Sequence, residues 1–349
     1  MKAMVLHGIN DFQLESVEEP VLKQEEVLVA VKAAGICGSD IPRVYQSGAY
    51  HYPLIPGHEF SGIVVKTGSV ANTEWIGQRV AVFPLIPCKS CLPCQQKQYE
   101  MCRNYDYLGS RRNGGFAEYV AVPVDNLMKI PDNVSFEQAA MLEPMAVAVH
   151  AMRRIAPANS DTVAVCGLGT IGSLLFMLLK EAGVKNVLAI GNKKSQKQMV
   201  LNLGLSEEDY CNSENSTVNK WIAEKTHKKG VDIFFECVGK NETQAMAIEN
   251  TAFGGQICMI GSPHTDICLK KVTYEKILRN QLTISGTWNS SYRGDETDDW
   301  HYALERISQN RIDPAQLISH RFSLQEVWKG FHIMRDKNED YGKIMGNIE

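Results

Sequence analysis

The most constraining feature of the sequence is a glycine-rich turn between an apolar strand and a helix in the middle of the chain. The motif Gly167-Leu168-Gly169-Thr170-Ile171-Gly172 follows the strand-like run 162–166 and opens the helical stretch 171–182. In this context the first glycine allows the turn, the second lets a pyrophosphate approach, and the third lets the helix pack on the strand. Because unpaired N–H groups at a helix N-terminus favour anions, the motif predicts a dinucleotide site.

Strand-like and helix-like segments alternate on both sides of this motif. The strand-like runs are 162–166, 187–190, 231–237 and 256–260, and the helical runs are 171–182, 197–203 and 243–251. This alternation indicates an α/β fold with a doubly wound parallel sheet, a Rossmann domain, over residues 151–287. Residues 1–150 instead show short strands at 26–33, 62–65 and 79–83, which indicates a β-rich domain.

Length, charge and cysteine content exclude several other classes of protein. A chain of 349 residues suggests about two domains, and a net charge of −4 excludes a strongly basic nucleic-acid binder. Ten cysteines are too few for a disulfide scaffold of this length. The apolar run 163–179 is shorter than the ~20 residues that a bilayer requires. No signal peptide is visible, so we expect a cytoplasmic protein without a membrane span.

Four cysteines form a compact cluster in a loop rich in proline and glutamine. Cys88, Cys91, Cys94 and Cys102 have the spacing C-x2-C-x2-C-x7-C. Four thiolates at this spacing can surround a structural zinc ion, which would supply folding free energy that the loop lacks. The bacterial iron–sulfur pattern differs, because it continues with x3 and Cys-Pro. A zinc knuckle for nucleic acid would need more basic residues than this loop carries.

Three further segments contain side chains that bind metals in other proteins. Cys37 begins Cys37-Gly38-Ser39-Asp40, His58 lies in Gly57-His58-Glu59, and Glu143 precedes a proline at the start of a helical run. Alone, each has an ordinary structural explanation: a core cysteine, a core or surface histidine, and a turn cap.

Taken together, these motifs resemble the zinc-containing medium-chain alcohol/polyol dehydrogenases over the full length of the chain. The zinc signature of that family is matched by Gly57-His58-Glu59, Gly62 and Gly68, although its usual valine is shifted to Val70. The other segments that carry the resemblance are 37–43, Tyr52-Pro53, 84–88 and 105–119. The resemblance implies a GroES-like catalytic domain over 1–150, to which residues 288–349 return.

The resemblance also implies roles for individual residues. Cys37, His58 and Glu143 would hold a catalytic zinc ion, with Glu59 as an alternate ligand when substrate is absent. Asp40 would accept the free N–H of His58 and fix its tautomer. Ser39 would carry the alcohol proton outward, although it could instead cap a helix. The implied reaction is reversible hydride transfer between a nicotinamide coenzyme and a secondary alcohol.

The residues after the second strand of the nucleotide domain indicate the coenzyme. A NAD site usually has Asp or Glu about 20 residues after the motif, but here the strand 187–190 is followed by Gly191-Asn192-Lys193-Lys194. A 2′-phosphate would be attracted by the two lysines. We therefore predict NADP(H) rather than NAD(H); the alternative is a solvated turn and a site that accepts both.

Arg111 and Arg112 are the candidate substrate residues, because guanidinium groups bind phosphate well. One of them, together with Arg43, would hold the phosphate of a sugar-alcohol phosphate of the galactitol 1-phosphate type; the alternative is that they are surface charges or subunit contacts. Other possible functions are a dehydrogenase of free, sorbitol-like polyols and a non-catalytic NADPH-binding protein. The resemblance implies a homo-dimer or homo-tetramer.

Overall fold

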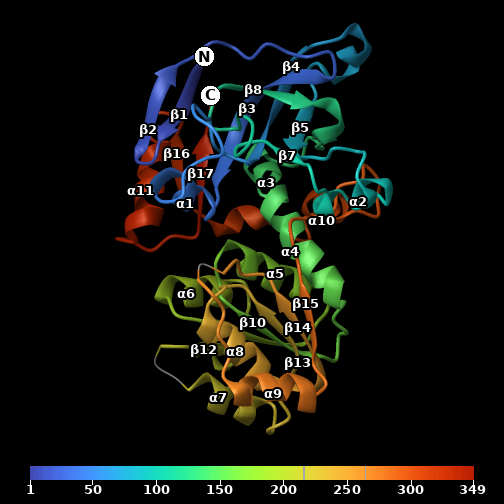
Figure 1. Cartoon of the computed structure of the whole chain (residues 1–349), viewed down its shortest axis with the longest axis vertical. Helices are drawn as coiled ribbons and strands as arrows, with labels where there is room; N and C mark the ends of the chain where they lie inside the picture. The colour runs from blue at the N-terminus through green and yellow to red at the C-terminus, as the bar shows by residue number, and fades with distance from the viewer. Residues whose placement is uncertain (215–216, 264) are drawn as a thin grey trace. The chain divides into compact units, whose positions relative to one another are not determined.

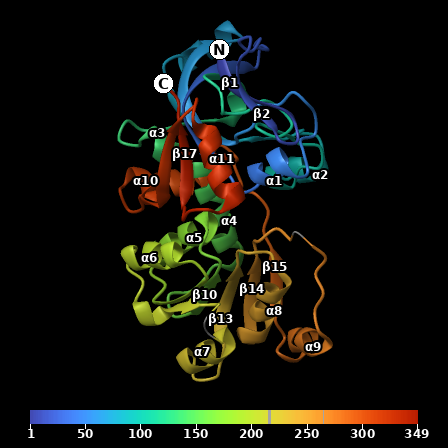
Figure 2. The same ribbon diagram turned by 90° about the vertical axis from the view of Figure 1, so that its left-hand side faces the viewer.

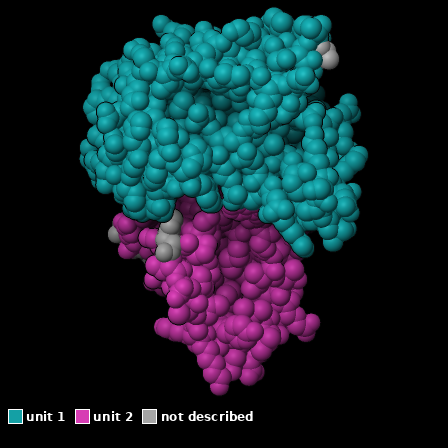
Figure 3. All heavy atoms as spheres, turned by 45° about the horizontal axis from the view of Figure 1, so that its top comes forward, with its two compact units in different colours: residues 1–146, 290–349 teal, residues 147–289 magenta. Residues whose placement is uncertain are grey.

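The computed structural model describes residues 1–214, 217–263 and 265–349, and divides the chain into two compact units. The first unit comprises residues 1–146 and 290–349, and the second unit comprises residues 147–289 (Figure 3). The sequence-based boundaries lie at residues 150 and 287, within a few residues of these limits.

The second unit is built on one six-stranded parallel sheet, as the alternation of strands and helices predicts. Its strand order is β12-β11-β10-β13-β14-β15, and all five strand pairs are parallel (Figure 1). The strands are β10 (Thr162–Cys166), β11 (Asn186–Gly191), β12 (Tyr210–Asn212), β13 (Val231–Glu236), β14 (Thr251–Met259) and β15 (Thr283–Gly286). The expected Rossmann fold is confirmed.

Helices cover both faces of this sheet. Figure 2 shows α5 and α6 on one side of the strands and α8 on the other. The helical elements are α4 (Leu142–Ile155), α5 (Thr170–Glu181), α6 (Lys194–Asn202), η4 (Glu207–Asp209), α7 (Val218–Lys225), α8 (Asn241–Asn250) and α9 (Lys271–Arg279). The sequence analysis did not predict α9 and β15, because most of their side chains are exposed and leave no continuous apolar run.

The apolar run 163–179 forms the centre of the second unit. Val163, Ala164 and Val165 of β10 are fully buried, and eight consecutive residues of α5, 172–179, are buried against the sheet. This burial explains the membrane-like composition of the run. Over the described ranges, no helix combines the length and the apolar character needed to cross a bilayer.

The first unit is β-rich and contains a seven-stranded sheet of order β16-β17-β3-β4-β5-β9, with β8 paired to β3. Its strands are β3 (Glu26–Ile36), β4 (Glu59–Thr67), β5 (Arg79–Val82), β8 (Tyr119–Pro123), β9 (Leu127–Lys129), β16 (Ile318–Ser323) and β17 (Lys343–Asn347). Two hairpin-like pairs complete it: β1 (Lys2–Gly8) with β2 (Asp11–Ser16), and β6 (Leu85–Ile86) with β7 (Asp106–Tyr107). The C-terminal residues thus return to this unit, as expected.

Short helices surround this sheet and connect its strands. They are α1 (Asp40–Tyr45), η1 (Val70–Trp75), α2 (Leu92–Gln95), η2 (Tyr99–Met101), η3 (Val124–Asn126), α3 (Phe136–Ala140), α10 (Asp299–Ser308), η5 (Pro314–Leu317) and α11 (Val327–Asp336). Helix α11 packs closely on the sheet at Gly330, where a Cβ atom would lie 2.7 Å from both Ile344 and Ile36. Phe331 of the same helix contacts the rings of Phe12 and Phe116 in the core.

The glycine motif offers a test of this packing. In Gly172→Ala, the new Cβ would collide with the carbonyl oxygen of Gly167, so we expect a loss of about 1–3 kcal/mol in the free energy of unfolding. Gly169→Ala is the matched control, because nothing lies within 4 Å of its Cβ position and its φ is −72°. Urea denaturation followed by circular dichroism measures both variants. Equal stability of the two would contradict the collision.

Candidate metal, coenzyme and substrate sites

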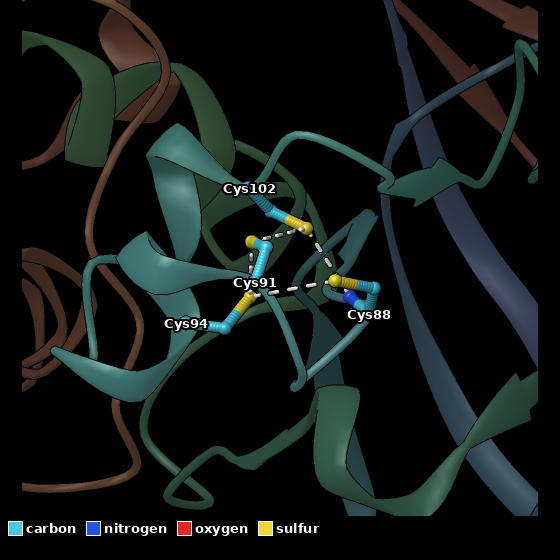
Figure 4. Close-up of side chains that lie close together, drawn as sticks. All are labelled: Cys88, Cys91, Cys94 and Cys102. Carbon is cyan, nitrogen blue, oxygen red and sulfur yellow. Dashed lines mark hydrogen bonds between the residues drawn. The ribbon is translucent and has the colours of Figure 1, made fainter.

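The four-thiol cluster (Cys88, Cys91, Cys94 and Cys102) has the dimensions of a tetrahedral metal site. Its sulfur atoms all lie within 4.8 Å of one another. The Sγ–Sγ distances are 3.5 Å for Cys91 and Cys94, 3.9 Å for Cys91 and Cys102, and 4.0 Å for Cys88 and Cys94 (Figure 4). A zinc ion with Zn–S bonds of about 2.3 Å requires sulfur atoms about 3.8 Å apart. All four cysteines are free. The cluster therefore fits a four-thiolate zinc ion.

Hydrogen-bond donors near the cluster lower the pKa of two of its thiols, Cys88 and Cys91. The backbone N–H of Cys88 donates to Sγ of Cys102 at 3.2 Å, and the Ser90 hydroxyl donates to Sγ of Cys88 at 3.5 Å. The hydroxyl and backbone N–H of Ser90, with the N–H of Cys91, lower the pKa of Cys88 to about 5. The pKa of Cys91 is also lowered, whereas burial raises that of Cys102 and raises that of Cys94 to about 12. Local hydrogen bonds therefore favour the thiolate form, which metals bind, at two of the four cysteines.

A second cluster, which we call the mixed cluster, consists of Cys37, His58 and Glu59. Its ligand atoms lie within 4.8 Å of one another, and both His58 and Glu59 are buried. Cys37 directly follows β3, while Glu59 begins β4. These strands are antiparallel with Gly35 opposite Glu59, so pairing of the strands brings the end of one beside the start of the other. A thiol, an imidazole and a carboxylate are a ligand set that zinc accepts.

Asp40 lies beside His58, but no hydrogen bond joins it to Nδ1 of that histidine in the part of the chain that the structure describes. The fully buried carboxylate of Asp40 lies 3.5 Å from Nδ1 of His58 and accepts hydrogen bonds from the Cys37 N–H at 3.1 Å and from Arg43 at 2.5 Å. Burial alone would lower the pKa of His58, but Asp40 and Cys37 outweigh it and raise that pKa well above its usual value. The same negative surroundings favour a divalent cation.

Lys343 is a buried cation beside the mixed cluster that the sequence analysis missed. It is 2% exposed and forms an ion pair with Glu59. Gly35 makes room for the pair, because a Cβ at this position would collide with the Glu59 carboxylate and lie 2.7 Å from Cε of Lys343. In sequence Lys343 is only the first residue of a strand. Its role arises from the antiparallel pairing of β17 with β3, which no local pattern reveals.

Glu143 lies near the mixed cluster but outside the group of ligand atoms within 4.8 Å. It is buried in the first turn of α4, and the Tyr107 hydroxyl donates to it at 3.3 Å. Burial raises the pKa of Glu143 to about 7. The ring of Tyr107 in turn contacts His58 edge-on, with a centroid distance of 5.8 Å. The structure thus groups Glu59, rather than Glu143, with Cys37 and His58.

Ser39 occupies the N-cap position of α1 but does not act as a side-chain cap. Its side chain makes no capping hydrogen bond, and the residue is exposed next to Cys37. A helix-capping function therefore does not explain this serine. Transfer of the alcohol proton remains its predicted role.

The glycine motif has the backbone geometry that the predicted dinucleotide site requires. Gly167 has a φ of +94°, which only glycine adopts readily, and Gly169 is the N-cap of the 12-residue helix α5. The space above Gly169 leaves its backbone accessible. Leu168 is buried, and Thr170 and Ile171 form the first turn of the helix. These features fit the pyrophosphate of a dinucleotide.

Residues 191–194, after β11, are the segment where a dinucleotide site is expected to contact the ribose. Gly191 is buried at the end of β11, where a Cβ would lie 3.1 Å from both Leu168 and Tyr210. Lys193 is the N-cap of α6 and Lys194 its first residue. The amide of Asn192 donates to Glu214 at 3.3 Å. One carboxylate, from the loop after β12, therefore approaches this segment, a feature that the sequence analysis missed.

The two candidate substrate arginines have different neighbours. Arg112 forms an ion pair with the buried Glu26 and lies 3.8 Å from Asp106. Arg111 instead lies between the rings of Tyr50 and Tyr105.

The buried pair of Lys343 and Glu59 predicts a large effect of mutation. Lys343→Met would leave the Glu59 carboxylate without its cation, so we expect a loss of about 3–5 kcal/mol in the free energy of unfolding. Lys329→Met is the control, because it removes an exposed pair with Glu326 and should cost less than about 1 kcal/mol. Chemical denaturation measures both. A loss below 1 kcal/mol for Lys343→Met would refute the structural importance of this pair.

Several curated proteins are similar to this chain. It is 33% identical to galactitol 1-phosphate 5-dehydrogenase of Escherichia coli over 336 residues, which is 95% of each chain. It is 30% identical to L-idonate 5-dehydrogenase of Vitis vinifera over 92% of this chain and 87% of that protein. It is 28% identical to sorbitol dehydrogenase of Arabidopsis thaliana over 98% of this chain and 94% of that protein.

Solved structures agree with this similarity. The crystal structure of galactitol-1-phosphate dehydrogenase from Escherichia coli has a TM-score of 0.91 at 30% identity, with 99% of this chain and 100% of that chain covered. A zinc-binding dehydrogenase from Sinorhizobium meliloti bound to NADP has a TM-score of 0.90 at 27% identity, over 99% and 98% of the two chains. An Escherichia coli alcohol dehydrogenase complexed with NADH has a TM-score of 0.90 at 26% identity, over 99% of each.

Family models match both units. The alcohol dehydrogenase GroES-like domain matches residues 23–132, and the zinc-binding dehydrogenase domain matches residues 170–309. With the relative that is 33% identical over 95% of the chain, these matches show that the chain belongs to the zinc-containing medium-chain alcohol and polyol dehydrogenases, a family of oxidoreductases.

Proposed function

We propose that this chain catalyses reversible hydride transfer between NADP(H) and a secondary alcohol of a polyol phosphate of the galactitol 1-phosphate type. The observation that carries the proposal is the convergence of Cys37, His58 and Glu59, with Asp40 behind the histidine. Similarity to galactitol 1-phosphate 5-dehydrogenase supports the phosphorylated substrate. The second candidate, a dehydrogenase of free polyols, is supported by the similarity to sorbitol dehydrogenase.

In the proposed mechanism, each residue of the site has one task. Cys37, His58 and either Glu59 or Glu143 would hold a catalytic zinc ion, which when bound supplies Lewis-acid polarisation of the substrate oxygen. Asp40 would hold the imidazole of His58 in one orientation. Lys343 stabilises the buried charge of Glu59. Ser39, exposed beside Cys37, takes the alcohol proton and passes it to solvent.

The four-thiol cluster would hold a second, structural zinc ion. Four protein ligands leave no open position for substrate, whereas the mixed cluster leaves one. No disulfide bond joins any of the ten cysteines, all of which lie in the described ranges, and we propose a cytoplasmic location. We also propose that the enzyme is a homo-dimer or homo-tetramer, in keeping with the family.

Support for NADP(H) comes from the segment after β11. Residues 191–194 contain no carboxylate and two lysines, and a neighbour of 27% identity binds NADP. Glu214 acts in the opposite sense, since its exposed carboxylate accepts a hydrogen bond from the amide of Asn192. Two lysines and one carboxylate are therefore the formal charges of residues 191–194 and 214.

Metal content and turnover test the proposed function together. We expect the purified protein to contain two zinc ions per chain and to oxidise galactitol 1-phosphate. Cys37→Ser should lose one zinc ion and about 100-fold or more in kcat/KM, because it removes a ligand of the catalytic ion. Cys94→Ser should lose the other zinc ion and lower the thermal midpoint. The control is Cys268→Ser, an exposed cysteine outside both clusters.

The outcomes separate the candidate functions. Turnover of free polyols alone would favour the sorbitol-like activity. One zinc ion per chain, with no turnover of either kind of polyol, would favour a non-catalytic NADPH-binding protein and overturn the proposal.

The coenzyme preference is tested at Asn192. Asn192→Asp places a carboxylate where NAD sites usually have one, so kcat/KM with NADP should fall by about 10- to 100-fold, with little change for NAD. Glu214→Gln is the companion variant and should increase the preference for NADP, because it removes a nearby negative charge. Initial rates with both coenzymes measure these effects. Wild-type kcat/KM that is equal or better with NAD would refute the NADP preference.

A further inference from the structure

Arg111 lies between two aromatic rings in the first unit. Its guanidinium carbon is 4.4 Å from the ring centroid of Tyr50 and 4.5 Å from that of Tyr105. Tyr50 is 70% exposed, so this sandwich opens toward solvent on one side. A cation stacked between two π faces is stabilised and held in one orientation.

Stacking uses the two faces of a guanidinium group and leaves its edge, which carries the N–H donors, for other partners. At Arg112 a carboxylate of Glu26 occupies this edge, and at Arg43 a carboxylate of Asp40 does so. No ion pair is recorded for Arg111 within the described ranges, and its buried Nε lacks a hydrogen-bond partner. The hydroxyls of Tyr50 and Tyr105 interact with the guanidinium and raise the pKa of Arg111 despite its desolvation, but neither residue is an acid of the carboxylate type. Arg111 is therefore a positioned cation without a neutralising acid.

This cation is fixed relative to the mixed cluster by a series of contacts. The rings of Tyr105 and Tyr107 are in contact, with centroids 6.1 Å apart, and Tyr107 contacts His58 at 5.8 Å. His51 donates from Nε2 to the carbonyl oxygen of Arg111 at 2.9 Å. The sandwich is thus two aromatic rings away from a proposed metal ligand.

Backbone hydrogen bonds also connect the loop that carries Arg111 to the loop that precedes His58. Gly114 donates to the carbonyl of Ile55 at 2.7 Å, Gly115 donates to that of Gly57 at 2.8 Å, and the Asn113 side chain accepts from the Ile55 N–H at 3.0 Å. The position of the guanidinium is therefore tied to that of His58.

We propose that the edge of Arg111 binds the terminal phosphate of a polyol phosphate whose secondary alcohol reacts at the mixed cluster. A phosphomonoester dianion matches the fork of N–H donors on the guanidinium edge, and the hydroxyls of Tyr50 and Tyr105 can donate to its remaining oxygen atoms. Arg112 does not take part, because its charge is used by Glu26. This assignment rests on the proposed function and explains how such an enzyme would distinguish a phosphorylated polyol from a free one.

Kinetics of Arg111 variants test this assignment. Arg111→Gln should raise KM for galactitol 1-phosphate by about 10- to 100-fold, since hydrogen bonds between charged groups are lost. It should leave kcat/KM for galactitol within about two-fold of wild type, because the free polyol has no group for this site. For Arg111→Lys, KM for galactitol 1-phosphate should lie between the values of wild type and Arg111→Gln. The matched control is Arg103→Gln, which removes one exposed cation from the same region. It should leave KM and kcat/KM unchanged for both galactitol 1-phosphate and galactitol.

A binding measurement provides a readout that does not depend on turnover. Inorganic phosphate, titrated calorimetrically into the zinc-loaded protein, should bind wild type and Arg103→Gln equally and Arg111→Gln about 10-fold or more weakly. It should compete with galactitol 1-phosphate but not with galactitol. Circular dichroism and thermal midpoints confirm that each variant is folded.

The outcomes distinguish this inference from the proposed function. If wild type oxidises galactitol while Arg111→Gln changes neither phosphate binding nor KM for galactitol 1-phosphate, the phosphate site is refuted and the dehydrogenase activity stands. An equal loss with both substrates would also refute it, because Arg111 would then act on the fold of the site. If wild type oxidises neither polyol, the proposed function fails, and the phosphate titration alone decides whether Arg111 binds the anion.

Discussion

The antiparallel pairing of β3 with β4 is the constraint on which the mixed cluster depends. This pairing sets Gly35 opposite Glu59, and it thereby brings Cys37, at the end of one strand, beside His58 and Glu59, at the start of the next. The pairing of β17 with the other edge of β3 then adds Lys343. A shift of one residue in either register would turn these side chains to the opposite face of the sheet. The geometry of the site therefore depends on the sheet, which places the residues that flank the strand ends, Cys37 and His58, side by side.

The two cysteine-containing clusters would hold a metal in two different ways. The four-thiol cluster is local: its ligands come from one segment of the chain, and a backbone N–H group and a serine hydroxyl donate to two of the sulfur atoms. The mixed cluster is non-local and buried, and it is surrounded by further charges, Asp40 and Lys343. The first has all four positions filled by protein. The mixed cluster would leave one coordination position open for a substrate oxygen, because three protein ligands do not complete a tetrahedron.

The sequence was sufficient to predict those features of the molecule that are determined by residues close together in the chain. The glycine motif revealed the Rossmann unit because strand, turn and helix are consecutive, and the spacing of the four cysteines indicated their cluster for the same reason. The proposed ligands Cys37 and His58 were linked to one site only through the resemblance, since no local pattern connects them. Lys343 was missed because its role depends on strand pairing across the whole chain. The sequence also could not show that Arg111 and Arg112 have different environments, because two adjacent residues can contact different parts of the folded chain.

The place of Lys343 in the chain has a consequence for how the protein is made. The four-thiol cluster is complete once residue 102 has left the ribosome, so a metal can occupy it while most of the polypeptide is still unsynthesised. The buried carboxylate of Glu59 gains its counter-ion only when β17, near the end of translation, joins the sheet. A nascent chain could therefore bind the proposed structural ion early, whereas the mixed cluster would be completed last, after both units have been translated.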